Sequence, residues 1–118
     1  MNNFIYEPGK KFLNPDRILF QAGLTAGQVA ADLGAGSGYF TIAAGQAVGT
    51  SGIVYGVDIL ESALNHITAE ARMKNVKNIK TVRADLEFVS SLNTISTGSC
   101  DCVMLVNILH QIIHKQEL

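Results

Sequence analysis

Four short, continuously apolar runs alternate along the chain with segments whose apolar residues recur at helical spacing. Each run lacks the polar alternation of a half-exposed strand, so we expect strands that are buried on both faces. Because helical segments separate them, the strands are predicted to lie parallel in an open, doubly wound α/β layer with right-handed crossovers. The four runs are Val29–Leu33, Ile53–Val57, Ile79–Ala84 and Asp101–Val106.

Helices are predicted before, between and after these strands. The segment Asn14-Pro15-Asp16 has the composition of a helix start. Asparagine there can accept a hydrogen bond from an uncapped amide, proline has the backbone angle of the first helical position, and aspartate suits the positive helix end. This helix is expected to stop near Gly23. Further helices are predicted over Tyr39–Val48, Glu61–Lys74 and Ile108–Leu118.

The composition predicts one globular domain over residues 1–118. Apolar residues make up 47% and charged residues 16% of the chain, which is typical of a folded domain. The formal net charge of -1 gives no argument for a polyanionic partner. No run approaches the length of a membrane span and the first residues lack a signal-peptide pattern, so we expect a cytoplasmic protein. Cys100 and Cys102 are predicted to be reduced thiols on the same face of one strand.

Three glycines within five residues follow the first predicted strand. They are Gly34, Gly36 and Gly38, in the stretch ADLGAGSGYF. A strand that passes through glycines into a helix leaves its backbone open to a ligand, and residues without a Cβ can adopt positive φ. The spacing differs from the Gly-x-Gly-x-x-Gly of dinucleotide sites, and no lysine followed by serine or threonine marks a phosphate loop. An NAD-dependent oxidoreductase is therefore a disfavoured alternative, and glycines that serve packing alone are another.

With this loop the sequence resembles the class I S-adenosylmethionine-dependent methyltransferases. ADLGAGSG is similar to their first motif, and VYGVDI, VRADLE and CDCVMLVNILHQI extend the resemblance over most of residues 14–114. The resemblance implies a Rossmann-like sheet in a three-layer αβα arrangement, here with about four strands in the order 3-2-1-4. It also implies S-adenosyl-L-methionine as the cofactor and a transferase that methylates an acceptor, for which we expect a small molecule.

Acidic residues lie at the ends of three predicted strands. Asp58 lies 22 positions after Gly36, about where an acidic residue meets the ribose in nucleotide-binding sheets. Its carboxylate can accept hydrogen bonds from both ribose hydroxyls. The alternative is that such aspartates only cap helices or turns after the strands.

The resemblance implies further contacts to the cofactor. Asp32 corresponds to the acidic residue that orients the methionine part, and Asp85 to a carboxylate that accepts a hydrogen bond from the exocyclic amine of adenine. Ile59 would pack on the adenine face, and the backbone amide of Leu86 would meet the ring. Asn107 lies where the fourth predicted strand opens beside the methionine part. The glycine loop contributes Gly34, Ala35, Gly36 and Gly38 to the same site.

Methyl transfer needs a general base only for some acceptors, because the sulfonium already activates its methyl group and alignment supplies much of the rate. His110 is the candidate base, and His114 lies four residues later on the same predicted helix. Surface-facing histidines and a two-ligand metal site are the alternatives, and no metal is predicted. His66 is expected to be exposed. The basic residues from Arg72 to Arg83 are interpreted as a solvated face rather than an RNA site.

The chain departs from the family in its number of strands. The family fold has seven, so we expect this chain to lack the C-terminal strands, either as a fragment of a larger methyltransferase or as a minimal form. The outer edge of the fourth predicted strand would then be bare, and a homodimer through this edge and the last helix would cover it. A non-catalytic module that binds S-adenosylmethionine or S-adenosylhomocysteine is the alternative to an enzyme.

Overall fold

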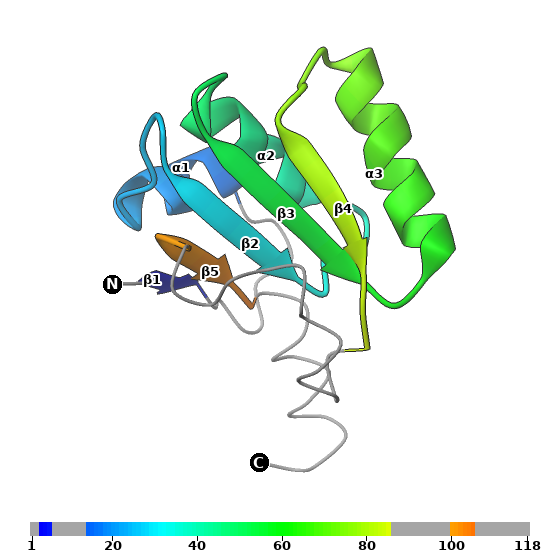
Figure 1. The fold of residues 1–118 in the computed structure, drawn as a ribbon. Coiled ribbons are helices and arrows are strands. Elements are labelled where there is room, and N and C mark those ends of the chain that lie inside the picture. Colours follow the sequence, from blue (N-terminus) through cyan, green and yellow to red (C-terminus); the bar gives the residue numbers. More distant parts are fainter. Residues whose placement is uncertain (1–2, 6–13, 86–99, 106–118) are drawn as a thin grey trace, which may run out of the picture.

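The computed structural model describes residues 3–5, 14–85 and 100–105. Within these residues, a parallel five-stranded sheet has the strand order β1-β5-β2-β3-β4, and three helices pack against it (Figure 1). The four strands predicted from the sequence adopt the predicted order 3-2-1-4, so the Rossmann-like α/β class is confirmed. The elements are β1 (Asn3–Ile5), α1 (Pro15–Gln21), β2 (Val29–Leu33), α2 (Tyr39–Val48), β3 (Ile53–Asp58), α3 (Glu61–Met73), β4 (Ile79–Arg83) and β5 (Cys102–Met104).

The outer edge of β5 is paired, and the expectation that it would be bare is wrong. Residues Asn3–Ile5 form β1, which runs parallel to Cys102–Met104 in the register Phe4 to Val103 (Figure 1). A three-residue strand within a polar stretch is too short to register as an apolar run, so the sequence pattern missed it. The argument for a homodimer through this edge therefore loses its premise.

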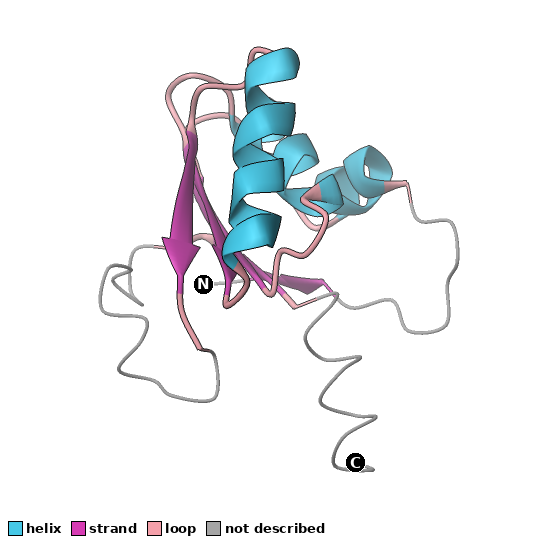
Figure 2. Cartoon of the chain, turned by 90° about the vertical axis from the view of Figure 1, so that its right-hand side faces the viewer, coloured by secondary structure: helices cyan, strands magenta, loops and turns pink. Residues whose placement is uncertain are grey.

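All three helices of the described residues lie on one face of the sheet (Figure 2). The chain moves from β2 to β3 to β4 in one direction across the sheet, so two crossovers of the same hand place α2 and α3 on the same face. The helix predicted over 108–118 lies outside the described residues. None of the described helices has the length and apolar character needed to cross a membrane.

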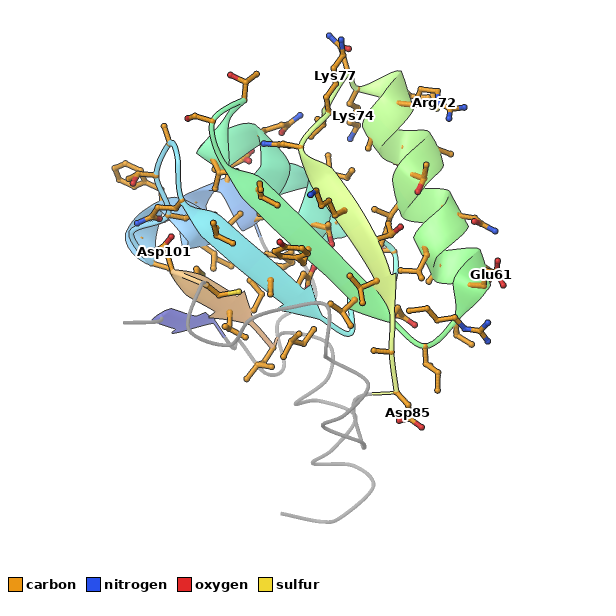
Figure 3. The ribbon with its side chains drawn as sticks, in the orientation of Figure 1. Glu61, Arg72, Lys74, Lys77, Asp85 and Asp101 are labelled. Atoms are coloured by element: carbon orange, nitrogen blue, oxygen red, sulfur yellow. The ribbon has the colours of Figure 1, made fainter. Side chains whose placement is uncertain are left out.

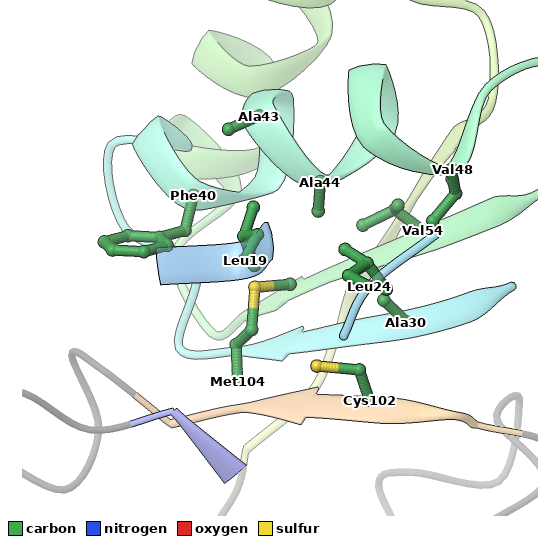
Figure 4. Packing of buried hydrophobic residues seen from close by; sticks show 10 residues of the cluster. All are labelled: Leu19, Leu24, Ala30, Phe40, Ala43, Ala44, Val48, Val54, Cys102 and Met104. Carbon is green, nitrogen blue, oxygen red and sulfur yellow. The ribbon is translucent and has the colours of Figure 1, made fainter. Parts of the chain in front are cut away.

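The main core lies between the sheet and the helices α1 and α2 (Figure 4). Leu19 of α1 and Val48 of α2 are fully buried, and Met104 of β5 points from the sheet toward Leu19. Burying a side chain of this size contributes about 1.5 to 3 kcal/mol, so this layer fixes the helices against the strands. The other members of the cluster are Leu24, Ala30, Phe40, Ala43, Ala44, Val54 and Cys102.

The two cysteines belong to different core clusters, so their predicted placement on one face is wrong. Cys102 packs in the main core with Ala30, whereas Cys100 joins a cluster with Ala31. Ala30 and Ala31 are consecutive in β2 and therefore point to opposite faces of the sheet. The expectation failed because β5 begins only at Cys102, and the alternation of a strand does not extend back to Cys100. Neither cysteine forms a disulfide.

Local signals set the helix ends as predicted. The side chain of Asn14 accepts a hydrogen bond from the amide of Arg17 (3.1 Å), and Pro15 is the first residue of α1. Helix α2 begins after Gly38 and ends at Val48, before Gly49. The side chain of Asn78, just before β4, stabilises the carboxyl end of this helix. Its Nδ2 donates hydrogen bonds to the carbonyls of Gly45 and Gly49.

Candidate functional site

The glycine loop connects β2 to α2 through three left-handed residues. The φ angles are +76° at Gly34, +58° at Gly36 and +82° at Gly38, a region that favours glycine. The amides of Gly34 and Ala35 both donate to the carbonyl of Val57, each over 2.8 Å. These two bonds bend the loop over the carboxyl end of β3. The prediction that the loop needs positive φ is confirmed.

Gly38 has a second, purely steric reason to be glycine. A Cβ at this position would lie 2.7 Å from Cγ1 of Ile67, a buried residue of α3. No ordinary Cβ contact is so short, so a side chain here would push α3 away from the loop. Packing therefore adds to the positive φ as a reason for glycine at position 38, and the alternative of packing alone does not account for it.

Asp58 joins the loop to the end of β3. Its Oδ2 accepts a hydrogen bond from the amide of Gly36 and its Oδ1 accepts one from the amide of Leu60, both over 2.9 Å. The second bond is the turn-capping contact that the alternative interpretation predicted. Each carboxylate oxygen has two lone pairs, so each keeps one acceptor position beyond these bonds. Asp58 is 9% exposed.

Asp32 is a buried carboxylate with only one of its oxygens engaged. Thr41 of α2 donates its hydroxyl to Oδ2 over 2.7 Å, whereas Oδ1 has no partner among the residues that the structure describes. Burial raises the pKa of Asp32 to about 6, the hydrogen bond from Thr41 lowers it, and the nearby charge of Asp58 raises it. A buried acceptor without a donor is costly, so this oxygen calls for an explanation.

Thr41 is a site residue that the sequence pattern missed. It is fully buried, although it stands in the first turn of a largely apolar helix. The sequence does contain a signal, a hydroxyl side chain in an apolar segment three residues after Gly38. A hydroxyl buried there needs a hydrogen-bond partner, so a buried acceptor is expected nearby.

The remaining predicted contacts lie along the same edge of the sheet. The amide of Ala84 donates to the carbonyl of Asp58 (3.1 Å), so the half-buried Asp85 follows next to the end of β3. Ile59 is 48% exposed, and its carbonyl accepts from Nε of Arg83 (3.0 Å). This anchoring contact of Arg83 was also missed by the sequence pattern. The predicted site residues Leu86, Asn107 and His110, together with His114, lie outside the described residues.

Charge is unevenly distributed over the described part of the molecule. Arg72, Lys74 and Lys77 gather around the end of α3 and the connection to β4, whereas Asp85 lies at the opposite end of that strand (Figure 3). Arg83 at the end of β4 pairs with Glu61 (3.6 Å), so Asp32, Asp58 and Asp85 leave the carboxyl ends of the strands with an acidic excess, which favours a cationic ligand over a polyphosphate. No group of three metal-ligating side chains occurs within 14–85 and the two short described segments.

A groove of about 700 Å³ opens elsewhere, on the helical layer. It touches the glycine loop at Ser37 and Gly38 but includes none of the three aspartates at the strand ends. Several of the side chains that line it, such as Tyr39 and His66, are exposed. The exposure of His66 is as predicted. We place the candidate site at the strand ends, where buried carboxylates and the loop converge.

Comparisons with known proteins identify the family. The profile of the family described as "Methyltransferase domain" matches residues 30–118. No curated protein matches the chain significantly. A methyltransferase from Aquifex aeolicus described as SAM-dependent shares 25% identity and a TM-score of 0.59, over 67% of this chain and 43% of that one.

Two further solved structures show the same fold. TrmN from Thermus thermophilus has 24% identity and a TM-score of 0.61, over 70% of this chain and 24% of that one. Fibrillarin from Aeropyrum pernix, with natively bound S-adenosyl-L-methionine, has 20% identity and a TM-score of 0.60, over 71% of this chain and 36% of that one. The chain spans less than half the length of each of these three structures. The resemblance seen in the sequence is confirmed: this chain belongs to the methyltransferase domain family.

Proposed function

We propose that this chain forms the cofactor-binding part of an S-adenosylmethionine-dependent methyltransferase. The observation that carries the proposal is Oδ1 of buried Asp32, which has no partner among the described residues and lies beside a loop of left-handed glycines and near the carboxylate of Asp58. S-adenosylmethionine is the cofactor that the family and its structural neighbours support.

The hydrogen bonds of the loop support a ligand without phosphates. The amides of Gly34, Ala35 and Gly38 donate to carbonyls of the protein, and that of Gly36 donates to Asp58. Phosphate-binding loops instead direct such amides at the ligand. With these amides engaged and carboxylates alongside, the site is poorly suited to the pyrophosphate of NAD. It is well suited to a ligand that presents hydroxyls and a cation.

The residues fit the parts of S-adenosylmethionine by their chemistry. Asp58 would accept from the ribose hydroxyls through its remaining lone pairs, and Oδ1 of Asp32 would accept from the ammonium of the methionine part. Ile59, half exposed beside this edge, would cover an adenine face, and Asp85 would accept from the exocyclic amine. When bound, the cofactor supplies an electrophilic methyl group on its sulfonium.

The protein would act mainly by positioning. Fixed cofactor contacts place the methyl group for in-line attack by an acceptor, and such alignment is worth several kcal/mol of the barrier. A small-molecule acceptor and His110 as general base are the finer parts of this proposal. Because the chain covers less than half of its structural neighbours, transferase activity of this chain alone is also a proposal. The alternative is a module that binds the cofactor without an acceptor site.

Calorimetry tests the cofactor assignment. We expect the chain to bind S-adenosylhomocysteine and not NAD. Asp58→Asn should weaken this binding by about 1 to 3 kcal/mol, the contribution of hydrogen bonds to a charged group. The control is Glu61→Gln, which removes a charge from an exposed residue near the site and should leave affinity unchanged. Binding of NAD without S-adenosylhomocysteine, or equal affinities of wild type and Asp58→Asn, would contradict the assignment.

Release of S-adenosylhomocysteine over a panel of small acceptors separates an enzyme from a binding module. Binding without turnover on any acceptor favours the module. The cytoplasmic location and the homodimer expected from the sequence stay predictions. Sedimentation equilibrium at micromolar concentration measures the oligomeric state directly, and the pairing of β1 with β5 leaves the proposed dimer edge already occupied over three residues.

A further inference from the structure

Thr41 fills a slot between two strands at the start of α2. Its hydroxyl donates to Oδ2 of Asp32 on β2 (2.7 Å), and its methyl group faces β3, where a Cβ on Gly56 would lie 3.1 Å from Cγ2. Asp32 and Gly56 are direct partners in the parallel register of these strands. The two contacts engage both branches of a side chain that is stiff at χ1, so they fix one rotamer.

Within the part of the chain that the structure describes, no positive charge contributes to the pKa shift of Asp32. From β3 it faces the carboxylate of Asp58, and from β5 the thiol of Cys102. Burial raises the pKa of that thiol to about 11, so it is neutral near pH 7. From α2 it faces Thr41, whose hydroxyl is a donor. Among the described residues, Thr41 is thus the group that favours the charged form of Asp32, against burial and a like charge.

We propose that Thr41 is a positioning residue for cofactor binding, which holds Asp32 ionised with Oδ1 as the open acceptor, so that binding of a cationic ligand is linked to release of a proton. This inference rests on the proposed function, because the ligand cation is the ammonium of the methionine part. A hydroxyl that donates to one oxygen of a carboxylate stabilises the charged form. It leaves the lone pairs of the second oxygen available to a ligand. The cation would then supply a donor to Oδ1, the oxygen of Asp32 that has no partner among the described residues.

The linkage has a defined direction with pH. Burial raises the pKa of Asp32 to about 6, so the carboxyl is increasingly protonated below that pH and loses its attraction for a cation. Affinity for S-adenosylhomocysteine, whose amino group is protonated throughout this range, should therefore fall as the pH drops from 7 to 5. Without the hydroxyl, the midpoint should move upward by about one unit, since a hydrogen bond to a charged group contributes about tenfold or more.

The experiment measures S-adenosylhomocysteine binding by calorimetry from pH 5 to pH 8.5. We expect Thr41→Val to bind about fivefold more weakly than wild type near pH 6 and about tenfold more weakly at pH 5, and to approach wild-type affinity at the highest pH. Thr41→Ser, which keeps the hydroxyl, should restore most of the wild-type profile. Thr68→Val is the matched control, because the Thr68 hydroxyl bonds within α3 to the carbonyl of Leu64, away from the loop.

The outcomes separate this inference from its premise. An equal loss of affinity at every pH would show a merely structural role for Thr41, and a profile of Thr41→Val equal to wild type would show no role; either overturns the inference. Failure of the wild type to bind S-adenosylhomocysteine at any pH overturns the proposed function itself. Urea unfolding of the same variants needs no ligand. There, Thr41→Val should shift the pH range in which Asp32 ionises, and an unshifted range would also overturn the inference.

Discussion

Replacing Asp32 by asparagine should remove a pH-dependent cost of folding. Burial raises the pKa of Asp32 to about 6 in the folded chain, above the ordinary value of 3.8. At a pH below the ordinary pKa, the carboxyl is neutral in the folded and the unfolded chain, and its burial does not lower the free energy of unfolding. As the pH rises, the unfolded chain ionises first and the folded chain only near pH 6. The group therefore lowers stability as the pH rises from about 4 to 6, and the loss is complete above that range.

The magnitude follows from the size of the pKa shift. The difference between a pKa of 3.8 and one of about 6 corresponds to about 3 kcal/mol. Asp32 is 1% exposed, so solvent screening is slight. Against a total stability of about 5 to 15 kcal/mol for a domain of ordinary size, this is a large contribution from one side chain. The structure accounts for it by the burial of the carboxyl and its one oxygen without a partner in the described residues.

The assay is urea unfolding at pH 4, 5, 6 and 7 of wild type and Asp32→Asn. The difference in unfolding free energy between the two proteins removes the contributions that the other carboxyl groups make to both. We expect Asp32→Asn to gain about 2 to 3 kcal/mol relative to wild type between pH 4 and pH 7. The control is Asp16→Asn, which removes a carboxylate from an exposed position in the first turn of α1 and leaves the buried site intact.

Two results would refute the reasoning about Asp32. A difference that stays constant with pH would mean that the carboxyl is not desolvated in the folded chain. A difference of opposite sign, in which wild type becomes more stable than the variant as the pH rises, would mean that a donor or cation outside the described residues stabilises the charged carboxylate. In the expected case, Asp32→Asn is the more stable protein near neutral pH and the weaker binder of S-adenosylhomocysteine, because the carboxylate is held for the ligand.

Gly38→Ala should destabilise the domain by about 2 to 5 kcal/mol, since it combines positive φ with a clash against Ile67. Gly27→Ala, which shares the positive φ but meets only ordinary contacts, should lose about 1 to 2 kcal/mol in the same urea titration; equal losses would contradict the clash. Asn78→Ala should cost about 1 to 3 kcal/mol, because two carbonyls at the end of α2 lose their donor. The exposed Asn65→Ala should show no such loss in thermal unfolding, and a similar loss in both would refute the role of the Asn78 clamp.

Local pattern determined most of the fold. Apolar runs located the four predicted strands, and the signals at Asn14 and Gly49 set helix ends that the structure shares. The glycine stretch predicted positive φ, which the structure has at all three positions. These features depend on side chains within a few residues of one another, so one sequence contains the information. The carboxylates at the strand ends could be predicted for the same reason, because the end of each strand is visible in the sequence.

What the tertiary structure decided depends on residues that are distant in the chain. Residues 3–5 become a strand only because the edge of β5, about a hundred positions away, offers unpaired backbone groups. Cys100 and Cys102 lie on opposite faces because β5 begins only at Cys102, and the alternation of a strand does not extend back to Cys100. Thr41 reaches Asp32 because α2 folds back over β2 and β3, and that burial is what raises the pKa of the carboxyl. Desolvation is a property of the whole packed environment, so the pattern of a single segment cannot reveal it.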